Sequence, residues 1–199
     1  HHKNMATADD PATARYNQPL YSFWISSVIN QYKNAWNIQL RLLVNKQKSF
    51  FSFENDMLFY LLFQGLYLGV IFAYLGSDGL LMALIVGISS FLFLETINYI
   101  EHYGLRRIAL PSGKYERITA LHSWNSNHIM GRIVLYELTR HSDHHFKSNK
   151  EYQVLEHKEE SPQLPFGYPT AMLLALIPPM WFRVMNSRIP INMLPEKMS

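Results

Sequence analysis

The sequence contains no cysteine. Disulfide frameworks, zinc-thiolate sites, iron–sulfur clusters and thiolate-ligated haem all need sulfur ligands, so these residues can form none of them. Any metal ion must therefore be held by histidine or carboxylate side chains. Excess charge of one sign is also lacking. The formal net charge is only +3 and the basic residues are scattered, whereas a nucleic-acid binder usually has a concentrated basic face.

Two long apolar stretches are present, although the mean hydropathy of −0.08 is ordinary. Residues 57–75 carry no charge, and as a helix they would reach about 28 Å, close to the thickness of the hydrocarbon core of a bilayer. After a turn at 76–79, residues 80–100 are apolar except for Glu95. We predict a transmembrane helical hairpin. The alternative, a buried hairpin in a soluble core, would need more apolar sequence elsewhere than the chain has.

Basic residues flank this hairpin on both sides: Arg41, Lys46 and Lys48 before it, and Arg106, Arg107 and Lys114 after it. The turn carries no Lys or Arg, so the positive-inside rule predicts that both ends are cytoplasmic. The expected organisation is a cytoplasmic or interfacial helical segment at 1–56, the hairpin at 57–100 and a cytoplasmic histidine-rich region at 101–199, together forming one catalytic domain. The predicted fold class is an all-α integral membrane protein with two transmembrane helices.

Two further segments are ambiguous. Asp10-Pro11 is typical of a helix N-cap followed by proline, and Trp24, Val28, Tyr32, Trp36 and Leu40 recur at fourfold spacing. This pattern fits a helix on the membrane surface and a plain soluble helix equally well. Residues 169–182 are apolar, but they contain Pro178-Pro179 and are too few to cross a bilayer comfortably, so we interpret them as an interfacial or a core segment.

The strongest chemical signal is Arg140-His141-Ser142-Asp143-His144-His145. A helix that starts at Gly131 and continues through this motif would place His141, His144 and His145 on one otherwise apolar face. Neutral imidazole binds iron, zinc or copper, and Asp143 could orient an imidazole by accepting its other N–H. A solvated histidine-rich loop is the alternative.

A second signal is Asn98-Tyr99-Ile100-Glu101-His102-Tyr103-Gly104, at the end of the second apolar stretch. Carboxylates in or near a span are costly unless they are paired or functional. Glu95 and Glu101 are therefore candidate partners that orient metal-bound imidazoles. A third signal is His1-His2, which resembles a purification-tag remnant but is followed by sequence unlike a vector linker.

These motifs resemble those of the membrane-bound alkane 1-monooxygenases, within the membrane fatty-acid desaturase/hydroxylase superfamily. Residues 98–104 are similar to the family's NYxEHYG, residues 138–145 to its LQRHSDHH with Thr139 in place of Gln, and His1-His2 to the end of its EHxxGHH. The similarity extends over nearly the whole chain. The family's HExxHK motif and the first His of EHxxGHH are absent, so we expect this chain to be a C-terminal fragment that is inactive alone.

The resemblance implies a di-iron site, two irons per full-length chain, with ligands His1, His2, His102, His141, His144 and His145. It implies hydroxylation of the terminal carbon of medium-chain n-alkanes with O2, electrons from rubredoxin and its reductase, and a multi-pass position in the bacterial inner membrane facing the cytoplasm. We expect Gly65, Gly69 and Gly87 to line a substrate groove. A xylene-type hydroxylase, a desaturase and a non-catalytic zinc-binding membrane protein remain alternatives.

Overall fold

The computed structural model describes residues 1, 4–146 and 149–194. In that part of the chain every regular element is a helix, and the extended pairings are two isolated bridges, Ala109–Tyr115 and Asn125–Gln163. The predicted all-α class is confirmed. Contacts divide the chain into two units, His1–Ser27 with Glu95–Ser199, and Val28–Leu94. The division into a segment at 1–56, a hairpin at 57–100 and a region at 101–199 stays a prediction.

Two long helices come first. Helix α1 (Leu20–Asn45) begins where the Phe23 N–H donates to the carbonyl of Pro19. The helix N-cap predicted at Asp10 was wrong, because no helix forms over residues 10–19 and the Asp10 carboxylate has other partners. Helix α2 (Asp56–His102) is the one described helix long and apolar enough to cross a membrane, and only 11% of its most apolar stretch is buried.

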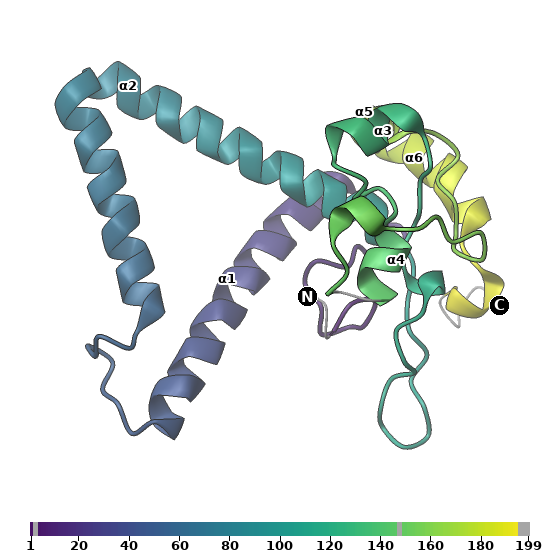
Figure 1. The fold of residues 1–199 in the computed structure, drawn as a ribbon, viewed down its shortest axis with the longest axis horizontal. Helices are drawn as coiled ribbons and strands as arrows, with labels where there is room; N and C mark the ends of the chain where they lie inside the picture. The colour runs from purple at the N-terminus through teal and green to yellow at the C-terminus, as the bar shows by residue number, and fades with distance from the viewer. Residues whose placement is uncertain (2–3, 147–148, 195–199) are drawn as a thin grey trace. The chain divides into compact units, whose positions relative to one another are not determined.

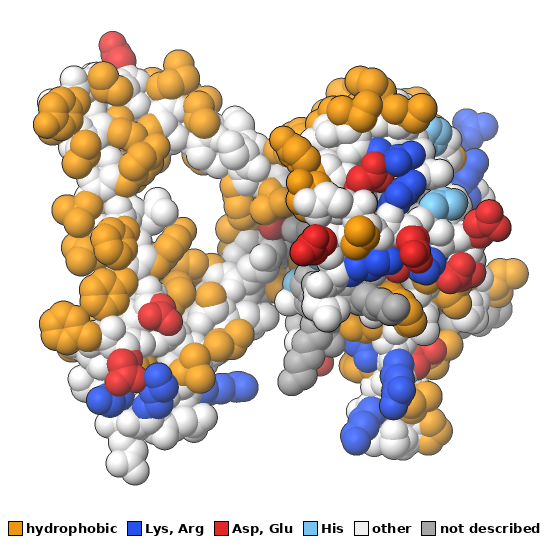
Figure 2. Space-filling view, viewed as in Figure 1, with side chains coloured by type: hydrophobic (Ala, Val, Ile, Leu, Met, Phe, Trp, Pro, Cys, Tyr) orange, Lys and Arg blue, Asp and Glu red, His pale blue; other side chains and the backbone are white. Residues whose placement is uncertain are grey.

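Helix α2 bends at Gly76, which is its single non-helical residue (φ 65°, ψ −161°). Glycine adopts this positive φ without the steric cost that a Cβ would add. The sequence predicted a turn at 76–79, but the structure concentrates the change of direction in one residue, and the helix resumes at Ser77 (Figure 1). Apolar side chains cover both arms of the bent helix (Figure 2). This exposure does not fit the core hairpin of a soluble protein.

The first unit also contains short helices: η1 (Ala120–His122), α3 (Ile129–Val134), α4 (His141–Phe146), η2 (Tyr152–Val154), α5 (Tyr168–Ala175), α6 (Pro178–Met185), η3 (Asn186–Arg188) and η4 (Ile191–Met193). Helices α5 and α6 pack against the end of α2 through an aromatic core. Its largest buried members are Tyr99, Tyr103, Trp124, Tyr168 and Trp181. This core fixes the last turn of α2 in the unit that carries the histidines.

Candidate metal centre

His102 is the last residue of α2 and is fully buried. The helix stops there because Gly104 takes a positive φ of 70°, and its N–H donates to the carbonyl of Ala14 over 2.9 Å. The end of the apolar helix is thus tied to the N-terminal loop, and the imidazole of His102 faces that loop.

His141 and His145 come from α4, where their i, i+4 spacing puts both rings on one side of the helix. One helical run from Gly131 into this motif was predicted, and that was wrong. Helix α3 ends at Val134, and the chain turns through Tyr136 and Glu137, which both have positive φ (50° and 64°), before α4 begins. Such angles are uncommon for residues other than glycine, so the sequence pattern did not reveal the turn.

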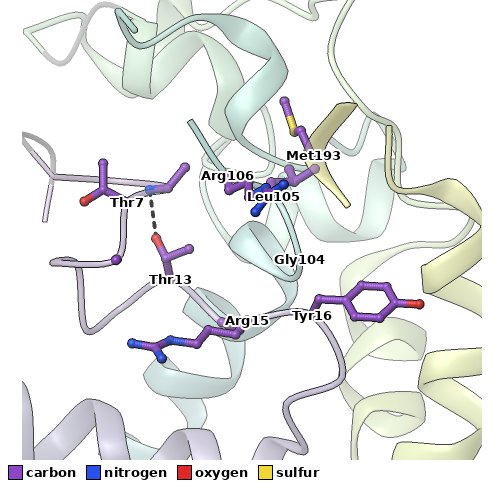
Figure 3. A pocket seen from close by; sticks show the side chains of 11 residues that line it. Thr7, Thr13, Arg15, Tyr16, Gly104, Leu105, Arg106 and Met193 are labelled. Atoms are coloured by element: carbon purple, nitrogen blue, oxygen red, sulfur yellow. Dashed lines mark hydrogen bonds between the residues drawn. The ribbon is translucent and has the colours of Figure 1, made fainter. Parts of the chain in front are cut away.

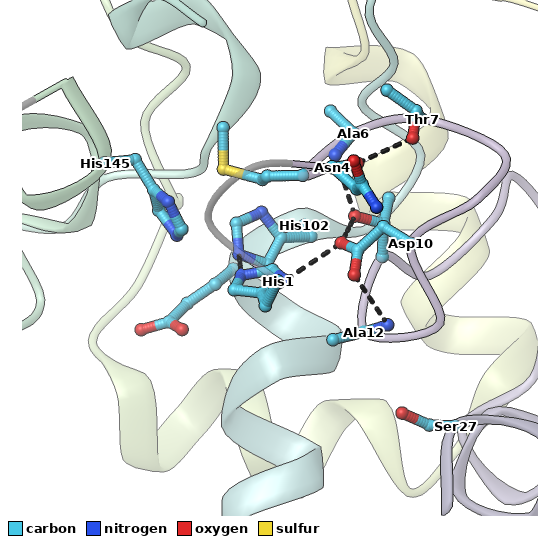
Figure 4. Close-up of polar contacts among 12 residues, drawn as sticks. His1, Asn4, Ala6, Thr7, Asp10, Ala12, Ser27, His102 and His145 are labelled. Carbon is cyan, nitrogen blue, oxygen red and sulfur yellow. Dashed lines mark hydrogen bonds and ion pairs between the residues drawn. The ribbon is translucent and has the colours of Figure 1, made fainter. Parts of the chain in front are cut away.

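His1 reaches the same place from the N-terminal loop (Figure 4). Its Nδ1–H donates to Asp10 Oδ2 over 2.9 Å, since an ionised carboxylate can only accept. Asp10 is itself fixed, because the Thr13 hydroxyl donates to Oδ2 over 2.6 Å and the Ala12 N–H donates to Oδ1 over 3.3 Å. With the proton on Nδ1, the lone pair of His1 Nε2 points away from Asp10 and towards His102 Nε2, 3.1 Å away.

The Nε2 atoms of these four histidines converge. His102 Nε2 lies 3.1 Å from His1 Nε2 and 3.1 Å from His141 Nε2, and His145 Nε2 lies 2.8 Å from His141 Nε2. One ligand atom from each of the four lies within 4.8 Å of all the others. Bonds of about 2.1 Å in a tetrahedral site would separate nitrogen ligands by about 3.4 Å. The donor set and its spacing therefore fit one metal ion bound by imidazole.

The other two predicted ligands, His2 and His144, are not among the four convergent histidines that the structure describes. His2 lies outside the described residues. His144 lies beside the cluster but is not one of the four convergent residues: its ring centroid is 5.7 Å from that of His141 and 5.6 Å from that of His145. Burial lowers the pKa of His144, which favours the neutral, ligand-competent imidazole.

Glu101 borders the cluster. Its Oε2 lies 3.2 Å from His141 Nε2, and its Oε1 accepts a hydrogen bond from the Tyr168 hydroxyl over 2.8 Å. Burial and the neighbouring Glu101 carboxyl raise the pKa of Tyr168 well above its usual value, so this hydroxyl keeps its proton. Helix α5 thus fixes the position of Glu101 beside His141.

The other two predicted carboxylates have partners of their own. The Asp143 carboxylate accepts from Lys150 Nζ over 2.7 Å and from the backbone N–H of Glu156 over 2.9 Å, and its role in orienting an imidazole stays a prediction. Burial alone would raise the pKa of Asp143, but these hydrogen bonds lower it. Glu95 is buried and accepts from the Ser27 hydroxyl over 2.6 Å. Its role towards an imidazole stays a prediction.

Sequence reasoning missed Asp10. A carboxylate that accepts the second N–H of a ligand histidine fixes its tautomer and its ring orientation. Asp10 was interpreted as a helix cap because proline follows it. Thr13, three residues later, is the signal that could have indicated a local turn in which the aspartate side chain is held by its own loop.

A pocket of about 300 Å³ lies next to this loop (Figure 3). The hydrogen bond from the Ala6 N–H to the Thr13 hydroxyl closes one wall, and Gly104 and Arg106 contribute to another. Its described lining contains no histidine and no carboxylate, so it is not part of the metal centre.

The sequence is similar to known proteins over most of its length. The model of the family "Fatty acid desaturase" matches residues 1–175. The chain is 43% identical over 189 residues to alkane 1-monooxygenase 2 of Alcanivorax borkumensis, covering 95% of this chain and 50% of that protein. It is 41% identical over 192 residues to alkane 1-monooxygenase of Acinetobacter baylyi, covering 95% and 46%.

A more distant relative is the xylene/toluene monooxygenase hydroxylase component of Pseudomonas putida. It is 32% identical over 184 residues, covering 92% of this chain and 48% of that protein. The chain therefore spans about half the length of the relatives it matches.

Proposed function

Because the chain belongs to the fatty acid desaturase family, we propose that it carries part of the di-iron centre of a membrane monooxygenase that hydroxylates the terminal carbon of medium-chain n-alkanes with O2. The convergence of the Nε2 atoms of His1, His102, His141 and His145 is the observation that carries the proposal. The activity is proposed for the protein that contains these residues together with the remaining histidine motifs of the family.

The chemistry of the substrate supports a metal oxidant. An alkane has no polar group for acid–base catalysis, so breaking its C–H bond requires oxidising chemistry, which iron supplies when bound. The residues of this chain hold and orient the ion. Asp10 keeps the proton on His1 Nδ1, and Tyr168 keeps Glu101 in place beside His141. His2 and His144 complete the proposed ligand set contributed by this chain.

Electrons have to come from outside these 199 residues, because they contain no cysteine and so form no iron–sulfur cluster. We propose a rubredoxin, reduced by its reductase, as the donor. The proposed location is the bacterial inner membrane, with the arms of α2 as two spans and the metal centre facing the cytoplasm, as the basic residues on both sides of 57–100 indicate.

We also propose that the alkane reaches the centre along the apolar surface of α2. A Cβ added at Gly65, Gly69 or Gly87 would meet nothing within 4 Å, so these positions leave open space beside the helix. Replacing each glycine by Trp in the complete protein should shift the preferred chain length of the substrate. Unchanged preference at all three positions would contradict the groove.

The activity is tested by expressing the protein that contains this chain together with a rubredoxin and its reductase, and supplying octane or p-xylene. Gas chromatography should detect 1-octanol, and the His102→Ala variant should form none. A benzylic alcohol from xylene without octanol would favour the alternative of a xylene-type hydroxylase, like the relative named a xylene/toluene monooxygenase component. An iron-loaded protein that oxidises neither compound would contradict both alternatives.

A further inference from the structure

We propose that α5, α6 and the corner between them form a re-entrant hairpin whose tip lies in the lipid bilayer. This inference rests on the proposed membrane location of α2. The sequence left residues 169–182 as either an interfacial or a core segment, and the structure shows that the two faces of the hairpin differ in environment.

One face belongs to the core. Ala171, Ala175 and Trp181 are fully buried, and the indole of Trp181 packs against Tyr99 and Tyr103 with ring centroids 5.6 and 5.4 Å apart. These contacts fix the hairpin against the last turns of α2. Its position relative to that helix is therefore determined within one compact unit.

The other face is apolar and exposed. Leu173, Leu176, Ile177 and Met180 are between 40% and 67% exposed. No charged residue occurs between Tyr168 and Phe182. In Figure 2 the apolar side chains gather at the top of the unit that contains α3 and α5. Contiguous exposed apolar surface of this kind marks an interaction site rather than an ordinary solvated surface.

The position of the corner along α2 indicates that lipid covers this exposed apolar face. At its start α5 is tied to the end of α2, because Tyr168 donates to Glu101. At its end the carbonyl of Leu176 accepts from the Tyr21 hydroxyl, and the Tyr21 ring contacts Trp24, whose indole N–H donates to Thr96. The end of α5 is thus linked through Tyr21 and Trp24 of α1 to Thr96, which lies about 9 Å before His102 along α2 by helical rise. Thr96 belongs to the stretch proposed to span the bilayer.

The backbone of the corner is also suited to lipid. Non-helical backbone is tolerated at membrane depth only where its polar groups are satisfied by protein. The Leu176 carbonyl has the Tyr21 hydroxyl, the Ile177 N–H donates to the Leu174 carbonyl, and the Ile177 carbonyl accepts from Met180 and Trp181. Pro178 and Pro179 bring no N–H to satisfy. The carbonyl of Leu176 and both the carbonyl and the N–H of Ile177 therefore have protein partners.

Helix α3 extends this surface. Its Gly131 packs next to Tyr168, the first residue of α5, and a Cβ there would lie 3.8 Å from the Cβ of Tyr168. The exposed residues of α3 are Ile129, Met130, Ile133 and Val134, all apolar. Because Tyr168 lies at the level of Glu101, α3 would rest at the interface while the α5–α6 corner reaches deeper.

The absence of native cysteine allows a direct test with single-cysteine variants carrying an environment-sensitive nitrobenzoxadiazole label. The 199-residue chain is reconstituted in phosphatidylethanolamine/phosphatidylglycerol vesicles with or without lipids brominated on their acyl chains. Ile177→Cys tests the corner, Leu84→Cys in the apolar arm of α2 is the positive control, and Glu160→Cys, at an exposed polar position, is the aqueous control.

The label at position 177 should lose fluorescence in brominated vesicles as the label at 84 does, and it should resist aqueous iodide, which quenches the label at 160. Quenching by iodide but not by bromolipid at 177, with normal bromolipid quenching at 84, would overturn the hairpin proposal. Protection of 177 from both quenchers would also overturn it, because it would show a protein contact instead. Failure of bromolipid to quench the label at 84 would instead contradict the membrane location in the proposed function.

Discussion

Substitution of Asp10 by asparagine tests the carboxylate that accepts the Nδ1 proton of His1, on the side of the ring opposite the proposed ligand atom Nε2. Asp10 Oδ2 accepts from both His1 Nδ1 and the Thr13 hydroxyl, while Oδ1 accepts from the Ala12 N–H. An asparagine has only one oxygen for these three donors. Its NH2 group must therefore face either the Ala12 N–H or the pair formed by His1 and Thr13.

Either orientation weakens the site. If the NH2 group faces His1, the Nδ1–H tautomer is disfavoured and the proton moves to Nε2, which removes the lone pair that faces His102. If the oxygen keeps its place, the carboxylate charge that raises the basicity of the imidazole is still lost. Loss of such an orienting partner typically lowers metal affinity by about 10- to 100-fold, or about 1.4 to 2.8 kcal/mol.

The assay is a competition titration of the detergent-solubilised chain with Co²⁺ or Zn²⁺ against a chromophoric chelator, with circular dichroism to confirm equal helix content. Asp9→Asn is the matched control, because it removes the same charge one residue away at an exposed position. It should leave the affinity unchanged. A well-folded Asp10→Asn variant with an affinity within about twofold of the parent would refute the orienting role, since the expected loss begins at about tenfold.

Two further predictions follow from the cluster and its surroundings. Tyr168→Phe removes the buried donor to Glu101, so it should lower the free energy of unfolding by about 1–3 kcal/mol in denaturant titrations. The control Tyr152→Phe, at an exposed ring, should change this free energy little. Equal effects of the two substitutions would contradict a structural role for the Tyr168–Glu101 hydrogen bond. His145→Ala should abolish binding of the first metal ion in the same competition titration, whereas His144→Ala should retain it, and a larger loss for His144→Ala would show that the four convergent histidines have been wrongly chosen.

The features of this fold that depend on local sequence could be predicted. The apolar runs on both sides of Gly76 predict helix because nothing in them interrupts it, and α2 confirms this over nearly its whole length. The motifs around His102 and His141 could be identified from their residue types. The distance between them along the chain is 39 residues, yet their Nε2 atoms lie 3.1 Å apart, and only the resemblance to a family suggested that contact.

Features set by tertiary contacts could not be predicted in this way. The turn at Tyr136 and Glu137 uses backbone angles that these residue types rarely adopt, so a periodic pattern continued through it without warning. Asp10-Pro11 has the local signature of a helix start, but the carboxylate is used by a histidine nine residues earlier. The composition of α5 could not show which of its faces is exposed, because the segment is apolar on both faces.

X-ray absorption spectroscopy of the zinc-loaded chain tests the central claim most directly, namely that the Nε2 atoms of His1, His102, His141 and His145 hold one metal ion. We predict a first shell of nitrogen ligands at about 2.0–2.1 Å with the outer-shell scattering of imidazole rings, and a reduced imidazole contribution in His102→Ala. A first shell made only of oxygen, or a spectrum that His102→Ala leaves unchanged, would contradict the claim.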